Sequence, residues 1–231
     1  MLEAVSQKYQ GSCVMVMEHT GEEVTFLGSG FLVHPEGYLL TAARTISGGG
    51  ELVVVPPDMD DNFAPVSREE VSPVPVEVVS KDIDHDVALL RLTPELEINM
   101  PSSILGDSTQ DARGAMLMSL GIPFGYYRIH GVIASQAILS GRIKSRSGTN
   151  MIIFDRRVQY GDTGGPLISV NGESVIGVVG GVFDPVELEG RETPEGVRPI
   201  NSDLSYAVSI EYGKALLDKA LEEKDLEEQA E

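Results

Sequence analysis

The stretch GDTGGPL at residues 161–167 combines one hydroxyl group with glycines that leave the backbone free to bend. Small residues of this kind let successive amides curl into a nest that accepts an anion. A threonine hydroxyl can act as a nucleophile, although the extra methyl group restricts its rotation. It attacks a carbonyl carbon only if a neighbouring group takes its proton. Whether Thr163 can react therefore depends on whether the chain places a base beside it.

Histidine is the side chain best suited to be that base, because it titrates near neutral pH. The chain has four histidines, His19, His34, His85 and His130, and they are scattered along the sequence. His85 precedes Asp86 directly, and in a strand the two side chains would point to opposite faces. For each histidine we favour an exposed or structural role. No Cys/His spacing indicates a metal site, and we expect neither a metal nor a cofactor.

Two further segments complete a pattern with the Gly-rich stretch. GSGFLV at residues 28–33 is followed by GYLLTAAR at 37–44, and DIDHDVALLR occupies 82–91. In this order and spacing, the three segments resemble the GSGF…GY-L-T-x-A-H, D-x₃-D-x-A-x-L and GNSGGPL patterns of HtrA-type serine proteases, which have the trypsin-like (chymotrypsin) fold. The resemblance spans most of residues 11–211. No PDZ domain follows it, so we expect the regulatory module common in that family to be missing.

The resemblance assigns family positions to single residues. Arg44 stands at the general-base histidine, Asp86 at the aspartate that orients it, and Thr163 at the nucleophilic serine. The backbone amides of Gly161 and Thr163 match the donors of the oxyanion hole. Arginine stays protonated at any pH that proteins experience, so Arg44 cannot take a proton. We expect it to pair with Asp86 instead, and its planar guanidinium can hold both carboxylate oxygens.

Peptide binding does not require a base, so a chain that has lost catalysis could still bind peptides. By the same resemblance, Val158 lines the first specificity pocket, and the run Val178, Val179, Gly180 and Gly181 is the strand with which a substrate peptide pairs. Strand addition at such an edge is a common way to bind peptides. The alternative is that these residues only preserve turns and barrel packing. The residues alone give the two interpretations equal weight.

Charge excludes some partners. The 231-residue chain carries a formal net charge of -19, so it lacks the basic surface of a nucleic-acid-binding protein and would be repelled by anionic membranes. Residues 184–203 hold six acids and two arginines. This loop borders the cleft in the family and could favour a basic peptide or cover the cleft. Five basic residues lie near the same end, and the sequence leaves open which charge faces the groove: Arg142, Lys144, Arg146, Arg156 and Arg157.

The elements that must position these residues are strands. Two consecutive sets of about six short apolar or β-branched segments are separated by the polar stretch 93–112, with no helical pattern between them. We expect an all-β chain of two six-stranded antiparallel barrels, formed by residues 1–105 and 106–211. Residues 2–9 suit a short helix. Leu216, Leu217, Ala220 and Leu221 recur at helical spacing. They predict a helix over 212–224 that lies on the second barrel, with an acidic frayed tail completing 212–231.

Three functions are compatible with this pattern. The leading hypothesis is an inactive protease homologue, a pseudoprotease that binds a peptide or protein ligand in the cleft between the barrels. The alternative is an active hydrolase that uses Thr163 with a rearranged base. The third is a structural subunit of a larger assembly. The single cysteine, Cys13, requires no oxidising compartment, and no signal peptide or apolar span of membrane length occurs. We therefore expect a cytoplasmic protein.

Overall fold

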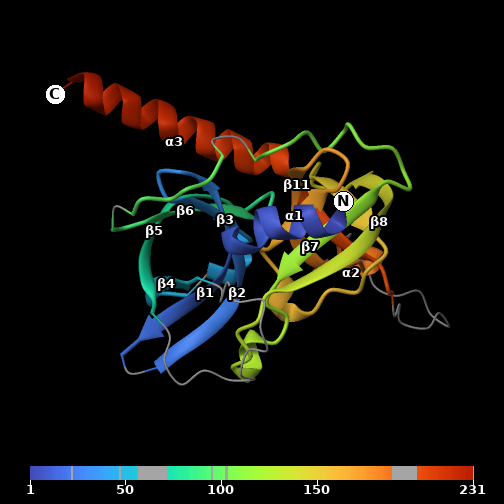
Figure 1. The fold of residues 1–231 in the computed structure, drawn as a ribbon, viewed down its shortest axis with the longest axis horizontal. Helices are drawn as coiled ribbons and strands as arrows, with labels where there is room; N and C mark the ends of the chain where they lie inside the picture. Colours follow the sequence, from blue (N-terminus) through green and yellow to red (C-terminus); the bar gives the residue numbers. More distant parts are fainter. Residues whose placement is uncertain are drawn as a thin grey trace.

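The computed structural model describes residues 1–21, 23–46, 48–56, 72–94, 96–101, 104–188 and 202–230. It contains two closed antiparallel barrels of six strands each, which lie side by side (Figure 1). The two barrels predicted from the sequence are therefore confirmed. Much of the acidic loop at 184–203, namely residues 189–201, lies outside the described residues.

The first barrel closes in the order β1-β2-β3-β6-β5-β4. Its strands are β1 (Cys13–Thr20), β2 (Glu23–His34), β3 (Tyr38–Thr41), β4 (Glu51–Val55), β5 (Val74–Asp82) and β6 (Val87–Leu92). In β1 the side chains alternate between two buried environments. Val14 and Val16 fill the barrel interior, whereas Met15 and Met17 pack outside it in a cluster with Ile122 of the second half. Burial on both faces explains why β1 is apolar without interruption from Cys13 to Met17.

The second barrel repeats this arrangement in the order β10-β11-β12-β9-β8-β7. Its strands are β7 (Met116–Gly121), β8 (Ile133–Lys144), β9 (Asn150–Phe154), β10 (Pro166–Ser169), β11 (Ser174–Val182) and β12 (Ser205–Ser209). Its interior is filled by a cluster that includes Leu139, Phe154, Leu167 and Val179. The Gly-rich stretch therefore lies where the chain enters β10.

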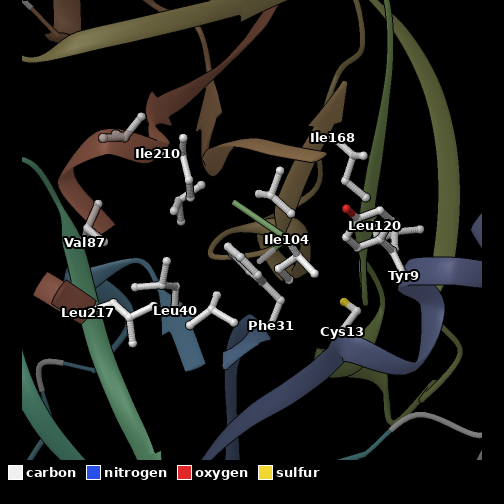
Figure 2. Packing of buried hydrophobic residues seen from close by; sticks show 14 of the residues in the cluster. Tyr9, Cys13, Phe31, Leu40, Val87, Ile104, Leu120, Ile168, Ile210 and Leu217 are labelled. Carbon is white, nitrogen blue, oxygen red and sulfur yellow. The ribbon is translucent and has the colours of Figure 1, made fainter. Parts of the chain in front are cut away.

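A shared apolar cluster joins the two barrels (Figure 2). Phe31 and Leu40 of the first barrel belong to the same buried cluster as Leu120 and Ile168 of the second. Tyr9 joins it from the N-terminal helix α1 (Leu2–Tyr9), which agrees with the helix expected at 2–9. The barrels thus bury apolar surface against each other, and this contact fixes how the segments 37–44 and 161–167 face one another.

The C-terminal helix differs from the prediction in length and position. Helix α3 (Ile210–Ala230) begins directly after β12 and continues through the expected frayed tail. It contacts β11, as expected, but also packs against β5 and β6 of the first barrel (Figure 1). Gly213 permits this approach, because an added Cβ would lie 2.5 Å from Leu40 Cδ1. Lys224 pairs with Glu36 and with Glu228, which offsets acidic repulsion in the last turns.

No helix in the described part of the chain is long and apolar enough to cross a membrane. The only cysteine, Cys13, is fully buried, and burial raises the pKa of its thiol.

We expect Phe31→Ala to lower the free energy of unfolding by about 3–5 kcal/mol, because it opens a cavity in the cluster between the barrels. Phe31 has 0% of its surface exposed. Val24→Ala, on the same strand but at a position that is 50% exposed, should cost less than about 1 kcal/mol. Urea denaturation of both variants measures the difference, and equal losses would contradict the role given to the shared cluster.

Candidate functional site at the interface of the barrels

The turn between β5 and β6 holds Asp86 in an unusual backbone conformation. Its φ of 55° lies in the left-handed region, which non-glycine residues rarely adopt. The backbone carbonyl of Asp86 accepts a hydrogen bond from the Ala43 amide at 3.3 Å. The side-chain oxygen Oδ1 accepts one from the Arg44 amide at 2.9 Å. These bonds fix the carboxylate beside the 3₁₀ helix Ala43–Ile46, so residues 44 and 86 are adjacent, as the resemblance implies.

The Arg44 side chain divides its hydrogen bonds between the two barrels. Nη1 lies 3.3 Å from Asp86 Oδ2 and donates to Tyr206 Oη at 2.9 Å. Nη2 donates to the carbonyl oxygen of Gly180. The expected ion pair with Asp86 is therefore present, and the same guanidinium also bonds to Gly180 and Tyr206. It extends from the first barrel to β11 and β12 of the second, and places a permanent positive charge between them.

Burial dominates the electrostatics of Asp86. Removal from water raises the pKa of its carboxyl above the ordinary value, while the charge of Arg44 and the hydrogen bond from the Arg44 amide act in the opposite direction. The ion pair only partly compensates, because the Arg44 side chain is 48% exposed and its charge is screened by solvent. Arg44 is thus held by Asp86 of the first barrel together with Gly180 and Tyr206 of the second.

Thr163 is buried and donates its hydroxyl proton to a backbone carbonyl. Its exposed fraction is 8%, and Oγ1 lies 3.1 Å from the carbonyl oxygen of Gly180. The same carbonyl accepts the bond from Arg44. A peptide carbonyl accepts hydrogen bonds but does not take up a proton near neutral pH. The hydroxyl is therefore directed at a group that cannot activate it.

The histidines of the described residues do not supply a base. Nδ1 of His85 contacts Asp82 at 2.7 Å, and its ring stacks on Tyr212 with centroids 3.8 Å apart. His85 lies in the turn before β6 and not in a strand, so the alternation of strand faces does not decide where its side chain points. His34 accepts a hydrogen bond from the Glu36 amide. Within the described ranges, no imidazole makes a hydrogen bond with Thr163 Oγ1.

The loop before Thr163 is a short 3₁₀ helix, Tyr160–Asp162. The Thr163 amide donates within this helix, to the Tyr160 carbonyl at 3.3 Å. Gly161 has no room for a side chain, because an added Cβ would lie 2.1 Å from the carbonyl oxygen of Ile122. Gly164 has a φ of +88° and lies against Ser29 in the same way. The glycines of this stretch are thus required by close backbone contacts.

The buried carboxylate of Asp162 fixes the loop through its contacts with neighbouring residues. Its carboxylate, 1% exposed, pairs with Arg156 at 3.0 Å and accepts the amide of Gln159 at 2.8 Å. Burial raises the pKa of Asp162, and Arg156 opposes this shift. Arg156 also donates to Ser119 Oγ at 2.7 Å. Arg156 is one of the five basic residues noted in the sequence. These contacts hold its side chain in the interior of the protein.

Ser29 and Tyr206 belong to the site, although sequence reasoning gave them no role. The amide of Ser29 donates to the Thr163 carbonyl at 2.8 Å, and its hydroxyl donates to the Gly161 carbonyl at 2.7 Å. The role of Ser29 could have been found from the motif GSGF, because a serine between two glycines suits a close backbone contact. Tyr206 offered no signal, since a tyrosine within an apolar strand is ordinary core composition.

A cavity of about 640 Å³ opens beside these residues. Its lining contains the expected Val158, Gly180 and Gly181, together with these residues: Arg44, Arg157, Gln159, Tyr160, Thr163, Val182 and Tyr206. Val178 and Val179, predicted in the same strand, are 1% and 0% exposed; Val178 packs in the cluster between the barrels, and Val179 packs inside the second barrel. Among the described residues, no group of three or more His, Cys, Asp or Glu side chains is placed to hold a metal ion.

Comparisons with known proteins agree with this geometry. Residues 28–178 match the model of the trypsin-like peptidase domain. A probable periplasmic serine endoprotease DegP-like of Halomonas elongata is 30% identical over 169 residues, which cover 70% of this chain and 31% of that protein. The magnetosome formation protease MamE of Magnetospirillum gryphiswaldense is 25% identical over 72% of this chain and 20% of its own length. The chain thus spans less than a third of these relatives.

Solved structures share the fold. The HtrA-type protease AlgW with tripeptide superimposes with a TM-score of 0.69 at 19% identity, covering 97% of this chain and 64% of that one. A protease from M. tuberculosis in its active form gives a TM-score of 0.69 at 22% identity, over 93% of this chain and 83% of that one. These identities support the fold alone.

We expect Asp86→Asn to change how stability depends on pH. Because burial raises the folded-state pKa of Asp86, its stabilising effect is complete below the unfolded-state pKa and is lost as the pH rises through the folded-state pKa. The unfolding free energy of the natural chain minus that of the variant should therefore fall between about pH 4 and about pH 7. Urea denaturation at both pH values measures it. A difference that stays level or rises over this window would mean that Arg44, not burial, determines the direction of the pKa shift of this carboxyl.

Proposed function

This chain belongs to the trypsin-like peptidase family, with the HtrA-type protease fold, and we propose that it is a pseudoprotease that binds a peptide or protein segment without cleaving it. The proposal has two parts. The first is the loss of peptidase chemistry at positions 44 and 163, and the second is the retention of a cavity beside β11. Each part rests on a different set of contacts and is tested by a different experiment.

The convergence of Arg44 and Thr163 on one carbonyl oxygen carries the first part. Peptide cleavage by a hydroxyl requires a base that accepts its proton and later returns it to the leaving amine. The hydroxyl of Thr163 instead donates to Gly180, and the group at the base position is a guanidinium that donates to the same oxygen. Loss of the base and of the serine together removes both partners of the proton transfer.

The loop at Thr163 supports the same conclusion. Stabilisation of an oxyanion requires amide groups aimed at the position where the charge develops. The Thr163 amide donates to the Tyr160 carbonyl instead, and the ion pair between Asp162 and Arg156 holds the loop in this form. One of the two amides matched to the oxyanion hole is thus engaged within the loop.

The cavity supports the second part of the proposal. Its volume lies in the range of sites that hold small ligands or side chains. Gly180 and Gly181 line it without side chains of their own, so a passing peptide can approach the backbone of β11 closely. AlgW, which shares the fold, is known in a structure with a tripeptide. A ligand in this groove would lie against Arg44 without meeting an activated nucleophile.

We expect the purified chain to leave a mixed peptide library uncleaved and to react with a serine-directed phosphonate probe no faster than its Thr163→Ala variant. The reason is that no base activates the hydroxyl. Mass spectrometry measures both reactions, with an active trypsin-like protease as the positive control. Turnover that disappears in Thr163→Ala would disprove inactivity and support the alternative, a hydrolase with a rearranged base.

Binding is tested by filling the cavity. At Gly181, an added Cβ would have Arg44 Nη2 at 3.8 Å and Tyr206 at 3.9 Å as its nearest neighbours, so Gly181→Phe can be accommodated while its ring enters the cavity. We expect the immobilised natural chain to enrich sequences from a displayed random-peptide library, and Gly181→Phe to abolish this enrichment. Gly141→Phe, where an added Cβ meets nothing within 4 Å, is the matched control. Equal enrichment by all three chains would place binding elsewhere.

A further inference from the structure

The charge of the cavity is opposite to that of the chain. Arg44 and Arg157 line it, and no acidic residue of the described ranges does. The chain as a whole has 36 acidic and 17 basic residues, so a wall whose charged members are all cationic is unusual for this protein. The sequence could not decide between acidic and basic side chains at the groove. In the described residues, the structure places arginines there.

The two arginines of the cavity differ from their basic neighbours in where they point. Arg156 is turned inward to Asp162 and Ser119, and Arg142 donates to the Ser108 carbonyl. Arg157 instead is exposed and reaches the cavity lining. Arg44 is held at the opposite barrel by the hydrogen bonds described above and remains 48% exposed. Each barrel therefore contributes one guanidinium group to the described part of the cavity lining.

Uncharged groups of the lining suit a carboxylate as well. Gln159 supplies amide donors, and Tyr160, which is 88% exposed, supplies a hydroxyl. Val158 is 4% exposed and offers an apolar wall for the methylene groups of a side chain. Guanidinium groups form the strongest hydrogen bonds with carboxylates, because both partners are charged and planar. A basic side chain in the same place would meet like charge and would be rejected.

From these contacts we infer that the cavity receives the side chain of an Asp or Glu from an extended peptide that passes along β11. This inference rests on the proposed function and names the ligand class of the same site. An internal residue is favoured over a chain end, because Gly180, Gly181 and Val182 of β11 form one side of the cavity and give a passing backbone a strand to follow. The acidic side chain then lies between Arg157 and Arg44.

The test uses four fluorescent peptides that differ at one central position or at the end. Three carry Glu, Gln or Lys between neutral flanking residues, with both ends blocked, and the fourth carries Gln with a free C-terminal carboxylate. Fluorescence anisotropy measures their affinities for the natural chain. We expect the Glu peptide to bind about tenfold more tightly than the Gln peptide, a preference that weakens as salt is added. The Lys peptide should bind most weakly of the blocked three.

Variants of Arg157 assign the preference to the cavity. Arg157→Gln should reduce the Glu-over-Gln preference by about tenfold, and Arg157→Lys should retain part of it. Arg113→Gln removes the same charge from an exposed position outside the cavity lining and should leave the preference unchanged. Urea midpoints equal to that of the natural chain confirm that each variant is folded.

The outcomes separate this inference from the function on which it rests. Equal binding of the Glu and Gln peptides, or a preference for Lys, would overturn the inference while peptide binding itself stands. Tight binding of only the peptide with the free end would assign the cavity to a C-terminus and would also overturn it. Failure of every peptide to bind would overturn both the inference and the binding part of the proposed function.

Discussion

The carbonyl oxygen of Gly180 is the point on which the site depends. It accepts hydrogen bonds from the guanidinium of Arg44 and from the hydroxyl of Thr163. In a working triad these two positions exchange a proton with each other. Here both are donors, and a backbone carbonyl that takes no proton satisfies them together. Under the proposed function, this shared acceptor is the reason why the chain would bind a peptide without cleaving it.

The rest of the fold brings these groups together and keeps them there. The apolar cluster around Phe31 sets the distance between the barrels, and α3 leaves the second barrel to pack on strands of the first. Ser29 ties the Gly-rich loop to β2 through its amide and its hydroxyl. An arginine is longer than a histidine, and its reach to Tyr206 adds one more bond across the same interface. The arginine at position 44 thus adds a hydrogen-bonded contact between the barrels.

Much of the fold could be predicted from the sequence, and part of the site could not. Strand alternation predicted the barrels, and the resemblance of three spaced segments to HtrA-type proteases implied that Arg44, Asp86 and Thr163 lie close together. The hydrogen bonds of Arg44 go to acceptors that include Tyr206 and Gly180. These two residues come close to Arg44 only because strands that are distant in the sequence pack together. The strand that contains Val178 and Val179 was identified from the sequence, but the burial of these two side chains depends on packing that spacing does not reveal. The contacts of α3 with the first barrel were not predicted, because helical spacing identifies an apolar face but not the strands against which that face packs.

The central claim is tested most directly by a crystal structure of the chain at a resolution that defines the guanidinium of Arg44 and the hydroxyl of Thr163. The account predicts that both donate to the carbonyl oxygen of Gly180, with the guanidinium also bonded to the Tyr206 hydroxyl. An Arg44 side chain turned to solvent, with an imidazole within about 3.2 Å of Thr163 Oγ1, would contradict it, because the hydroxyl would then have a base.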